Sequence, residues 1–313
     1  MNNSCVTEAE QKLEDEVSVL AGIKVRNVKD ARRFTTFFIG GEIRRLIEVN
    51  SESEIRSVMG ALKAVGARIR YLGAGSNLLL GPCVQDWVIK LGRGFRSLNV
   101  SGNSKTLEVG ASMPLMTLCR EVASRGLSGL EFAGGIPASF GGACRMNAGA
   151  HGGQICDVLR SITFIDSQGV ISRVSVDELE FSYRRCSLPH DALILSATIE
   201  LAEASPERVI ARQRECLAQR KAAQPLALPS AGSVFRNPAN ERTAGVLIES
   251  CGLKGMKFGA AQISEKHGNW IVNPSRQATS EDVMKLIALC QREVSGSYSI
   301  DLVPELVVWD VPQ

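Results

Sequence analysis

The spacing of apolar positions between residues 46 and 80 changes from that of a strand to that of a helix and back again. "LIEV" is a short apolar strand, and apolar residues then recur at helical spacing over residues 55–65. Ser51, with Glu54 three residues later, has the pattern of a capping box, and Gly66 is suited to end the helix. Because "RIRYL" resumes as a strand, this part predicts a β-α-β unit.

The middle of the chain continues with one helix and then turns to strands. Helical spacing predicts a helix over residues 115–125, which Gly126 ends. Farther on, residues 161–166 and 170–176 alternate like two strands, and the turn "SQG" between them predicts a hairpin. Residues 192–201 are expected to form another strand.

The last third of the chain reads as a separate unit. Residues 206–223 predict a charged, Arg-rich helix that acts as a hinge, and residues 224–232 read as a loop. Beyond the loop we expect two helices and a closing strand, at residues 243–250, 279–294 and 302–309. Thr279 and Asp282 form a second capping-box pattern at the start of the longer helix.

Composition limits the class of protein. With 313 residues the chain is long enough for two or three compact units, and 44 % hydrophobic with 22 % charged residues is ordinary for a globular protein. A net charge of +3, with dispersed Lys and Arg, gives no reason to expect nucleic acid or a membrane surface as partner. No apolar run approaches the roughly 18 residues of a membrane span.

Cysteine usage and the N-terminus favour the cytoplasm. The nine cysteines occur singly, without C-x-x-C or the spacing of metal ligands, so we expect reduced thiols and no metal. The first residues are polar and acidic, whereas a signal peptide needs a basic patch and an apolar core.

The segment "YLGAGSNLLL", residues 71–80, is the first candidate for chemistry. Gly73-x-Gly75 follows a strand, as in a Rossmann dinucleotide loop, but the next residues read as a strand where that motif needs a helix. The loop could instead present its backbone amides, with Ser76 and Asn77, to a pyrophosphate as a concave anion site. A plain glycine turn is the alternative.

A second candidate is "AGGIPASFGGACRMNAGAHGG", residues 133–153, which holds seven glycines and no acidic residue. Its middle shows neither helical nor strand periodicity, and no Walker pattern occurs in the chain. Two such segments suit a long ligand with two ends, such as a flavin dinucleotide. A tightly packed turn of small residues is the alternative.

These segments together resemble a known family. "YLGAGSNLLL", "GLEFAGGIPASFGGACRMNAGAHGG", "FSYRRC", "AGSVFRNP" and "LVPELVVW", in this order, are similar to UDP-N-acetylenolpyruvoylglucosamine reductases, and the resemblance runs from about Gly40 to Trp309. It implies that the whole chain has an α+β fold. This fold consists of a two-subdomain FAD-binding fold of the vanillyl-alcohol-oxidase type and an α+β substrate domain. The expected parts are residues 1–90, residues 91–208 with 301–313 returning to them, and the substrate-binding residues 209–300.

The resemblance also implies cofactors and their contacts. FAD is expected to bind without a covalent link, and NADPH to act as reductant. In the first glycine segment the expected FAD contacts are Tyr71, Gly73, Gly75, Ser76, Asn77 and Leu78. In the second they are Gly134, Gly135, Ile136, Pro137, Gly141, Gly142, Asn147, Ala148 and Gly149.

Three residues are implied to be catalytic. Ser233 of "AGSVFRNP" would donate a proton to carbon, although a serine after glycine is more often a turn or helix cap. Arg184 of "FSYRRC" would bind the substrate carboxylate, unless it is a surface arginine, as its neighbour Arg185 is expected to be. Glu305, after a proline in an apolar strand, would hydrogen-bond the developing enolate, kept protonated by burial, unless it is an edge residue facing solvent.

Other polar residues are candidates for the substrate. Tyr183, Asn237 and Lys254 are expected to contact it. Gln262, His267 and Asn269 are further candidates, and these three and Lys254 could equally be solvated loop residues. His151 stands where relatives often carry an aromatic residue. The connection from Arg184 to residue 192 is short, so the tyrosine-bearing loop of one branch is missing and the chain resembles the shorter, type II branch.

The function implied is NADPH-dependent reduction of UDP-N-acetylglucosamine enolpyruvate to UDP-N-acetylmuramate, for peptidoglycan synthesis, by a monomer in the cytoplasm. Its partners are then a UDP-sugar and NADPH, with no nucleic acid and no membrane. Two alternatives stay open. A flavin oxidase of the same fold would need neither Ser233 nor Glu305, and a regulatory nucleotide-binding protein would keep the glycine segments without turnover.

Overall fold

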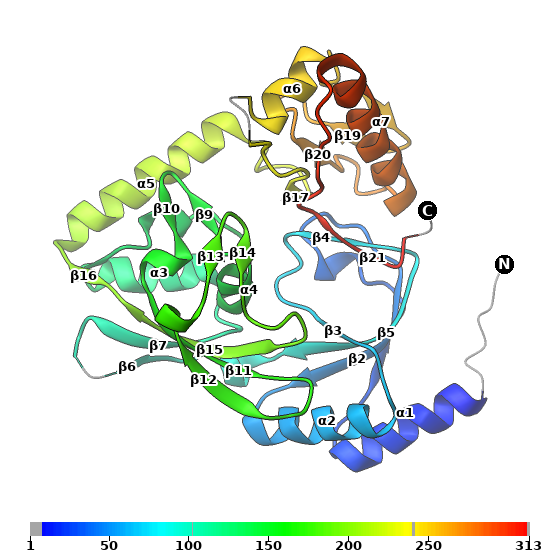
Figure 1. The fold of residues 1–313 in the computed structure, drawn as a ribbon, viewed down its shortest axis with the longest axis vertical. Helices are drawn as coiled ribbons and strands as arrows, with labels where there is room; N and C mark the ends of the chain where they lie inside the picture. Colours follow the sequence, from blue (N-terminus) through cyan, green and yellow to red (C-terminus); the bar gives the residue numbers. More distant parts are fainter. Residues whose placement is uncertain (1–7, 102, 240–241, 312–313) are drawn as a thin grey trace. The chain divides into compact units, whose positions relative to one another are not determined.

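The computed structural model describes residues 8–101, 103–239 and 242–311, which form two compact units (Figure 1). The first unit contains the chain up to Asn27, Arg44–Gly73 and Asp86–Cys216. The second unit contains Val28–Ile43, Ala74–Gln85 and the chain from Leu217 on. The chain therefore passes between the units several times, and the last passage falls inside helix α5 (Pro206–Ala223), which the sequence predicts as a hinge.

A five-stranded antiparallel sheet organises one half of the first unit. Its strand order is β12-β11-β15-β7-β6, with bounds Ile171–Ser175, Leu159–Ile165, Leu193–Glu200, Thr106–Gly110 and Leu98–Val100. The predicted hairpin is confirmed, because β11 and β12 pair antiparallel from Ser161–Ser175 to Ile165–Ile171. Helices α3 (Leu115–Ser124) and α4 (Phe140–Arg145) belong to the same unit.

A four-stranded sheet contains the predicted β-α-β unit. The strand order is β1-β2-β5-β3, with bounds Arg26–Val28, Glu42–Val49, Cys83–Leu91 and Ile69–Tyr71. Helix α2 (Glu52–Ala64) begins after Ser51, whose hydroxyl accepts the Glu54 N–H, and it packs beside α1 (Glu8–Ala21) (Figure 1). The capping box is incomplete, since the Glu54 carboxylate accepts the N–H of Asn50 rather than that of Ser51.

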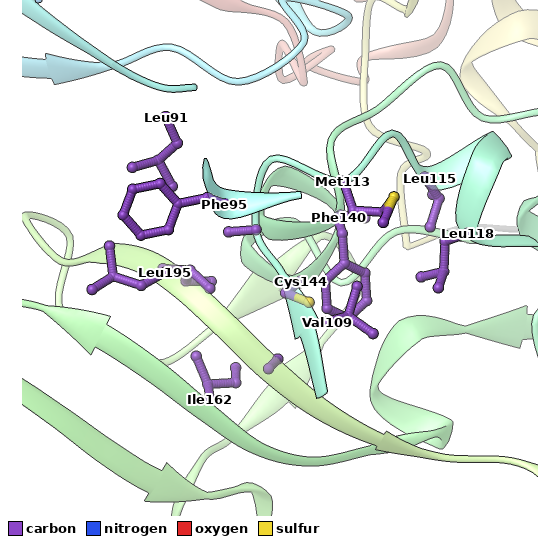
Figure 2. Packing of buried hydrophobic residues seen from close by; sticks show 14 of the residues in the cluster. Leu91, Phe95, Val109, Met113, Leu115, Leu118, Phe140, Cys144, Ile162 and Leu195 are labelled. Carbon is purple, nitrogen blue, oxygen red and sulfur yellow. The ribbon is translucent and has the colours of Figure 1, made fainter. Parts of the chain in front are cut away.

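The core of the first unit joins both of its sheets to the small helices. Figure 2 shows Phe140 and Cys144 of α4 beside Val109 of β7. Phe140 is fully buried, and burying a side chain of this size contributes about 2 kcal/mol or more. The glycine-rich segment 133–153 is thus anchored from within by apolar contacts.

The second unit has its own sheet and core. The antiparallel strand order is β17-β20-β19-β18, with bounds Ser230–Ser233, Trp270–Val272, Ala261–Ile263 and Lys257–Phe258. Helices α6 (Ala244–Ser250) and α7 (Ser280–Tyr298) contribute to its core, and the Thr279–Asp282 capping box of α7 is confirmed. Strands β4 (Leu78–Leu80) and β21 (Val307–Trp309) form a separate parallel pair.

The remaining elements are short. Two-residue strands are β8 (Leu127–Ser128), β9 (Gly149–Ala150), β10 (Gly153–Gln154), β13 (Phe181–Ser182), β14 (Arg185–Cys186) and β16 (Ala202–Glu203). Single 3-10 turns occur at Arg32–Phe34, Arg93–Phe95, Glu131–Ala133, Ile155–Asp157 and Val176–Glu178.

Two expectations differ from the structure. The middle of the second glycine segment contains helix α4, which begins after the cap Ser139 although it shows no helical periodicity. At the end of the chain, regular strand covers only Val307–Trp309, and Pro304 forms an isolated bridge with Phe235 instead. That strand pairs in parallel with β4. The three-part division of the chain stays a prediction.

Candidate active site

The first glycine segment is a tight loop between two strands, β3 and β4, so the Rossmann alternative is excluded. Gly75 has a φ of +64°, and a Cβ there would lie 2.0 Å from the carbonyl oxygen of Phe34. Only glycine fits this position. The Thr36 N–H donates to the Gly75 carbonyl, which fixes the loop within the second unit.

The amides of this loop fit an anionic ligand. Among the described residues, the N–H groups of Ala74 through Asn77 have no hydrogen-bond acceptor, although they sit in a loop that is otherwise firmly held. Consecutive free amides of this kind form a concave anion site. The residues present therefore fit the pyrophosphate of a dinucleotide.

The second glycine segment approaches the first within the first unit. A Cβ on Gly73 would lie 2.8 Å from Oγ of Ser139, the residue that caps α4 by accepting the Gly142 N–H. The backbone of Gly153 is equally close to an aromatic ring, since a Cβ there would lie 2.7 Å from Cδ1 of Phe132. The expected FAD contacts at Gly73, Gly141 and Gly142 thus belong to one packed region, and their roles stay predictions.

Two of the expected FAD contacts, Tyr71 and Asn147, form hydrogen bonds with other residues of the protein through their side chains. The Tyr71 hydroxyl donates to the Asp191 carbonyl at 3.0 Å, and burial raises the pKa of Tyr71 to about 12. Asn147 is 2 % exposed with a φ of +39°. Its Nδ2 donates to Ser182 O and Gln154 Oε1, at 3.2 and 3.0 Å, and its Oδ1 accepts the Cys156 N–H at 3.1 Å.

Asn147 therefore braces the hairpin that carries Arg184. Strands β13 and β14 pair Ser182 with Arg185, which leaves Tyr183 and Arg184 at the turn. Arg184 has a φ of +59°, and its guanidinium lies 4.9 Å from the centre of the Tyr183 ring. Tyr183 is 50 % exposed and Arg185 is exposed, so the hairpin tip offers an aromatic and a cationic group.

Ser233 is neither a helix cap nor a loop residue. It is the last residue of β17, pairs with Trp270, and follows Gly232, whose φ is +79°. Its hydroxyl makes no hydrogen bond to another described residue. The hydroxyl is thus available to a ligand, as a proton donor must be.

Glu305 is held directly against the segment of Ser233. The Glu305 N–H donates to the carbonyl of Val234 at 2.8 Å, and Phe235 forms an antiparallel bridge with Pro304. Nδ2 of Asn77 donates to the Glu305 carbonyl at 3.0 Å. The second unit therefore brings together two of the three expected catalytic residues and a residue of the first glycine loop.

The remaining candidates are spread over the second unit. Oδ1 of Asn237 accepts the Ala244 N–H at the start of α6, and Lys254 forms an ion pair with Glu249 at 3.3 Å. Glu249 also accepts the Gly268 N–H. Substrate contacts of Asn237 and Lys254 stay predictions.

His267 and Asn269 are not solvated loop residues. His267 is half-buried, and this burial lowers the pKa of its imidazole. Asn269 is buried, with both side-chain polar atoms bonded to the backbone of Phe235. Gln262 lines a cavity of about 710 Å³ with Lys221, Leu226 and Lys266.

One anchoring residue gives no signal in the sequence. The guanidinium of Arg145, at the end of α4, donates to the carbonyls of Leu188 and Pro189 at 3.1 and 3.0 Å, and to that of Ala192. Burial lowers the pKa of Arg145. It fastens the segment after Arg184 to the second glycine segment, and only the fold could reveal this.

The described part of the chain contains no helix that is long and apolar enough to cross a membrane. Within the same residues, no group of three or more His, Cys, Asp or Glu side chains could hold a metal ion.

Comparisons with known proteins identify the family to which the chain is similar. Residues 43–175 match the model of an FAD-binding domain, and residues 224–309 match the model of the C-terminal domain of UDP-N-acetylenolpyruvoylglucosamine reductase. The reductase of that name from Bacillus licheniformis is 37 % identical over 300 residues, which cover 95 % of this chain and 98 % of the relative. The Bacillus subtilis reductase is 37 % identical over 88 % of this chain and 90 % of its own.

A solved structure extends the similarity to the fold. The crystal structure of UDP-N-acetylenolpyruvylglucosamine reductase from Thermus caldophilus matches with a TM-score of 0.79 and 36 % identity, over 92 % of this chain and 99 % of that one. The predicted α+β fold with an FAD-binding domain is confirmed. The fold and these matches thus define an FAD-containing oxidoreductase. The chain belongs to the UDP-N-acetylenolpyruvoylglucosamine reductase family.

Proposed function

We propose that this protein reduces the enolpyruvyl group of UDP-N-acetylglucosamine enolpyruvate to the lactyl group of UDP-N-acetylmuramate, with NADPH as reductant. Family membership supports the reaction class. One observation carries the proposal. The Glu305 N–H bonds to Val234 O, and Asn77 of the anion-binding loop bonds to Glu305 O, so both expected acids lie beside the loop that fits the cofactor.

When bound, FAD supplies the hydride that the β-carbon of the enolpyruvyl double bond accepts. Ser233 then gives its proton to the α-carbon, where negative charge develops. A serine hydroxyl is a weak acid, but an enolate carbon is a stronger base, so the transfer can proceed downhill if the hydroxyl is held against the carbon. The backbone pairing of Ser233 with Trp270 supports this role, because it holds the backbone of Ser233 in place.

Arg184 and Glu305 stabilise the charge. The planar guanidinium of Arg184 can bind the substrate carboxylate with two parallel hydrogen bonds. The carboxyl of Glu305 hydrogen-bonds the developing enolate. Tyr183 stacks on Arg184, and with Asn237 and Lys254 it is proposed to contact the UDP-sugar.

The wider setting belongs to the same proposal. The product is a precursor of peptidoglycan, so the protein serves cell-wall synthesis, and through it cell shape and division, in the cytoplasm. We propose that it acts as a monomer, with no nucleic-acid or membrane partner.

The test is the visible spectrum in two half-reactions. Purified protein should be yellow, NADPH should bleach it, and the enolpyruvyl sugar nucleotide should restore the colour. Ser233→Ala should still be bleached and should recolour at least about 10²-fold more slowly. Ser230→Ala, on the same strand but with no assigned role, is the matched control and should behave like the wild type.

Three outcomes would contradict the proposal. Rapid recolouring by oxygen alone would indicate a flavin oxidase. Binding of nucleotide without any bleaching would indicate a regulatory protein. Normal recolouring of Ser233→Ala by the sugar nucleotide would remove Ser233 from its role.

A further inference from the structure

Asn269 makes three hydrogen bonds to the two residues that follow Ser233. Its Oδ1 accepts the Phe235 N–H at 2.9 Å, and its Nδ2 donates to the Phe235 carbonyl at 2.8 Å. Its backbone carbonyl accepts the Val234 N–H at 3.0 Å. Since Asn269 is only 3 % exposed, water does not compete for these bonds.

The Asn269 side chain takes the place of a neighbouring strand beyond the end of the β17–β20 pairing. Strand β17 pairs with β20 at Ser230–Val272 and Ser233–Trp270, with a register shift between the two pairs, and the pairing ends at Ser233. Beyond this point the peptide of Phe235 is still buried, and its N–H and C=O both need partners. A carboxamide has the same donor and acceptor as a peptide group, so it continues the ladder. The two groups of Phe235 also fix which atom of Asn269 is oxygen.

The same peptides hold Glu305. The carbonyl of Val234, whose N–H bonds to Asn269, accepts the N–H groups of Glu305 and Leu306 at 2.8 and 3.3 Å. A tilt of this segment would therefore move the Ser233 hydroxyl and the Glu305 backbone together. Both polar atoms of the Asn269 side chain bond to the peptide of Phe235, so the side chain serves the segment that follows Ser233.

We propose that Asn269 is a positioning residue, which sets the direction of the Ser233 hydroxyl and so the rate of proton delivery to the substrate. The inference rests on the proposed role of Ser233. Its effect should appear in the step that consumes substrate and not in the step that consumes NADPH.

Asn269→Asp tests this with little change of shape. The aspartate still accepts the Phe235 N–H, but an ionised carboxylate cannot donate to the Phe235 carbonyl and repels it. A misplacement of about 1 Å can lower a rate about 10²-fold. Recolouring by the enolpyruvyl sugar nucleotide should slow by this factor, while bleaching by NADPH keeps the wild-type rate. Recolouring should recover as the pH falls, because a protonated aspartate donates again.

Asn273→Asp is the matched control. Asn273 lies directly after β20, is fully buried, and donates from Nδ2 to the carbonyls of Phe37 and Phe38 at 3.2 and 3.3 Å. The substitution removes the same kind of donor from carbonyls outside the Ser233 segment. It should lower the unfolding temperature as much as Asn269→Asp does, without slowing recolouring.

A second variant and a measurement without substrate keep the proposal testable if Asn269→Asp does not fold. If Asn269→Asp does not fold, the uncharged Asn269→Ser takes its place. In either variant the Phe235 amide should exchange its hydrogen faster than in the wild type, whereas Asn273→Asp should leave it protected.

The outcomes separate two failures. Equal slowing of recolouring in the Asn269 and Asn273 variants, or equal slowing of both half-reactions in Asn269→Asp, would overturn the positioning role alone. Wild-type protein that NADPH bleaches but the sugar nucleotide does not recolour would overturn the proposed function, and the positioning role with it.

Discussion

The hairpin that carries Arg184 and the strand end that carries Ser233 are built with very different tightness. Arg184 lies at a two-residue turn with a left-handed backbone, and Asn147 braces the turn through a single carbonyl, that of Ser182. The segment after Ser233 is bonded on one side to Asn269 and on the other to Glu305. The Arg184 hairpin is therefore held by Asn147 at one carbonyl, whereas the segment after Ser233 is held from two sides.

The difference matches the chemistry proposed for each residue. The attraction between a guanidinium and a carboxylate falls only as the inverse of distance, and a long side chain can adjust to its partner. Proton transfer to carbon needs the hydroxyl within hydrogen-bond distance of the reacting atom. We therefore expect the Ser233 segment to be sensitive to small displacements that the Arg184 hairpin tolerates.

The largest effect should come from the loop beside Glu305. Gly75→Ala would place a Cβ 2.0 Å from the Phe34 carbonyl oxygen in a left-handed backbone. We expect a loss of about 3 kcal/mol or more in the free energy of unfolding, and protein that is purified without flavin. Urea denaturation and the ratio of flavin absorbance to protein absorbance measure both.

Gly66→Ala is the control for backbone strain alone. Gly66 has nearly the same φ, +61°, but a Cβ there would meet no atom within 4 Å. The expected cost is about 1 kcal/mol, with full flavin content. Equal effects of the two substitutions would show that close packing around Gly75 does not matter.

The next effect concerns the hairpin. Arg184→Ala should lower kcat/KM for the sugar nucleotide about 10²- to 10³-fold, since it removes the charge that offsets the carboxylate. Arg184→Lys keeps the charge without the planar fork and should lose about tenfold less. Stopped-flow recolouring measures this, and Arg185→Lys at the exposed neighbour should change nothing. If Arg184→Lys recolours as slowly as Arg184→Ala, the position of the charge matters as much here as at Ser233, which would contradict the comparison.

A smaller effect should follow from removing the brace of the hairpin. Asn147→Leu leaves the Cys156 N–H and the Ser182 carbonyl without this partner, and a left-handed backbone disfavours leucine more than asparagine. We expect a loss of about 2 kcal/mol in the free energy of unfolding. An unchanged denaturation midpoint would mean that water replaces the carboxamide.

Local features of this fold could be predicted from sequence, and distant ones could not. The bounds of α5 and the capping box of α7 depend on residues within a few positions of each other, so periodicity and caps locate them. Helix α4 escaped prediction because glycines dilute its apolar pattern, and packing of Phe140 into the core stabilises it.

The candidate site divides in the same way. Its residue types could be recognised because glycine, serine and arginine occur in characteristic short segments. Their supports could not, since Asn269 lies 34 residues from Phe235 and Asn77 lies 228 residues from Glu305. An asparagine read alone carries no sign of whether it will bind a ligand or a peptide, because its donor and acceptor suit both.

The smallest effect concerns acid stability near the Ser233 segment. His267 faces Glu249, Lys254 and the ring of Trp270, and burial lowers the pKa of its imidazole. Below the ordinary pKa of about 6.5 the unfolded chain therefore binds a proton that the folded chain resists. Stability should therefore fall as the pH drops through the ordinary pKa of histidine, and the loss should be small because this group is only half-buried. His267→Gln should flatten the profile in urea denaturation, because glutamine does not titrate. If the wild type and His267→Gln lose stability equally steeply as the pH falls, the loss comes from other groups. His267 would then not make the second unit sensitive to acid.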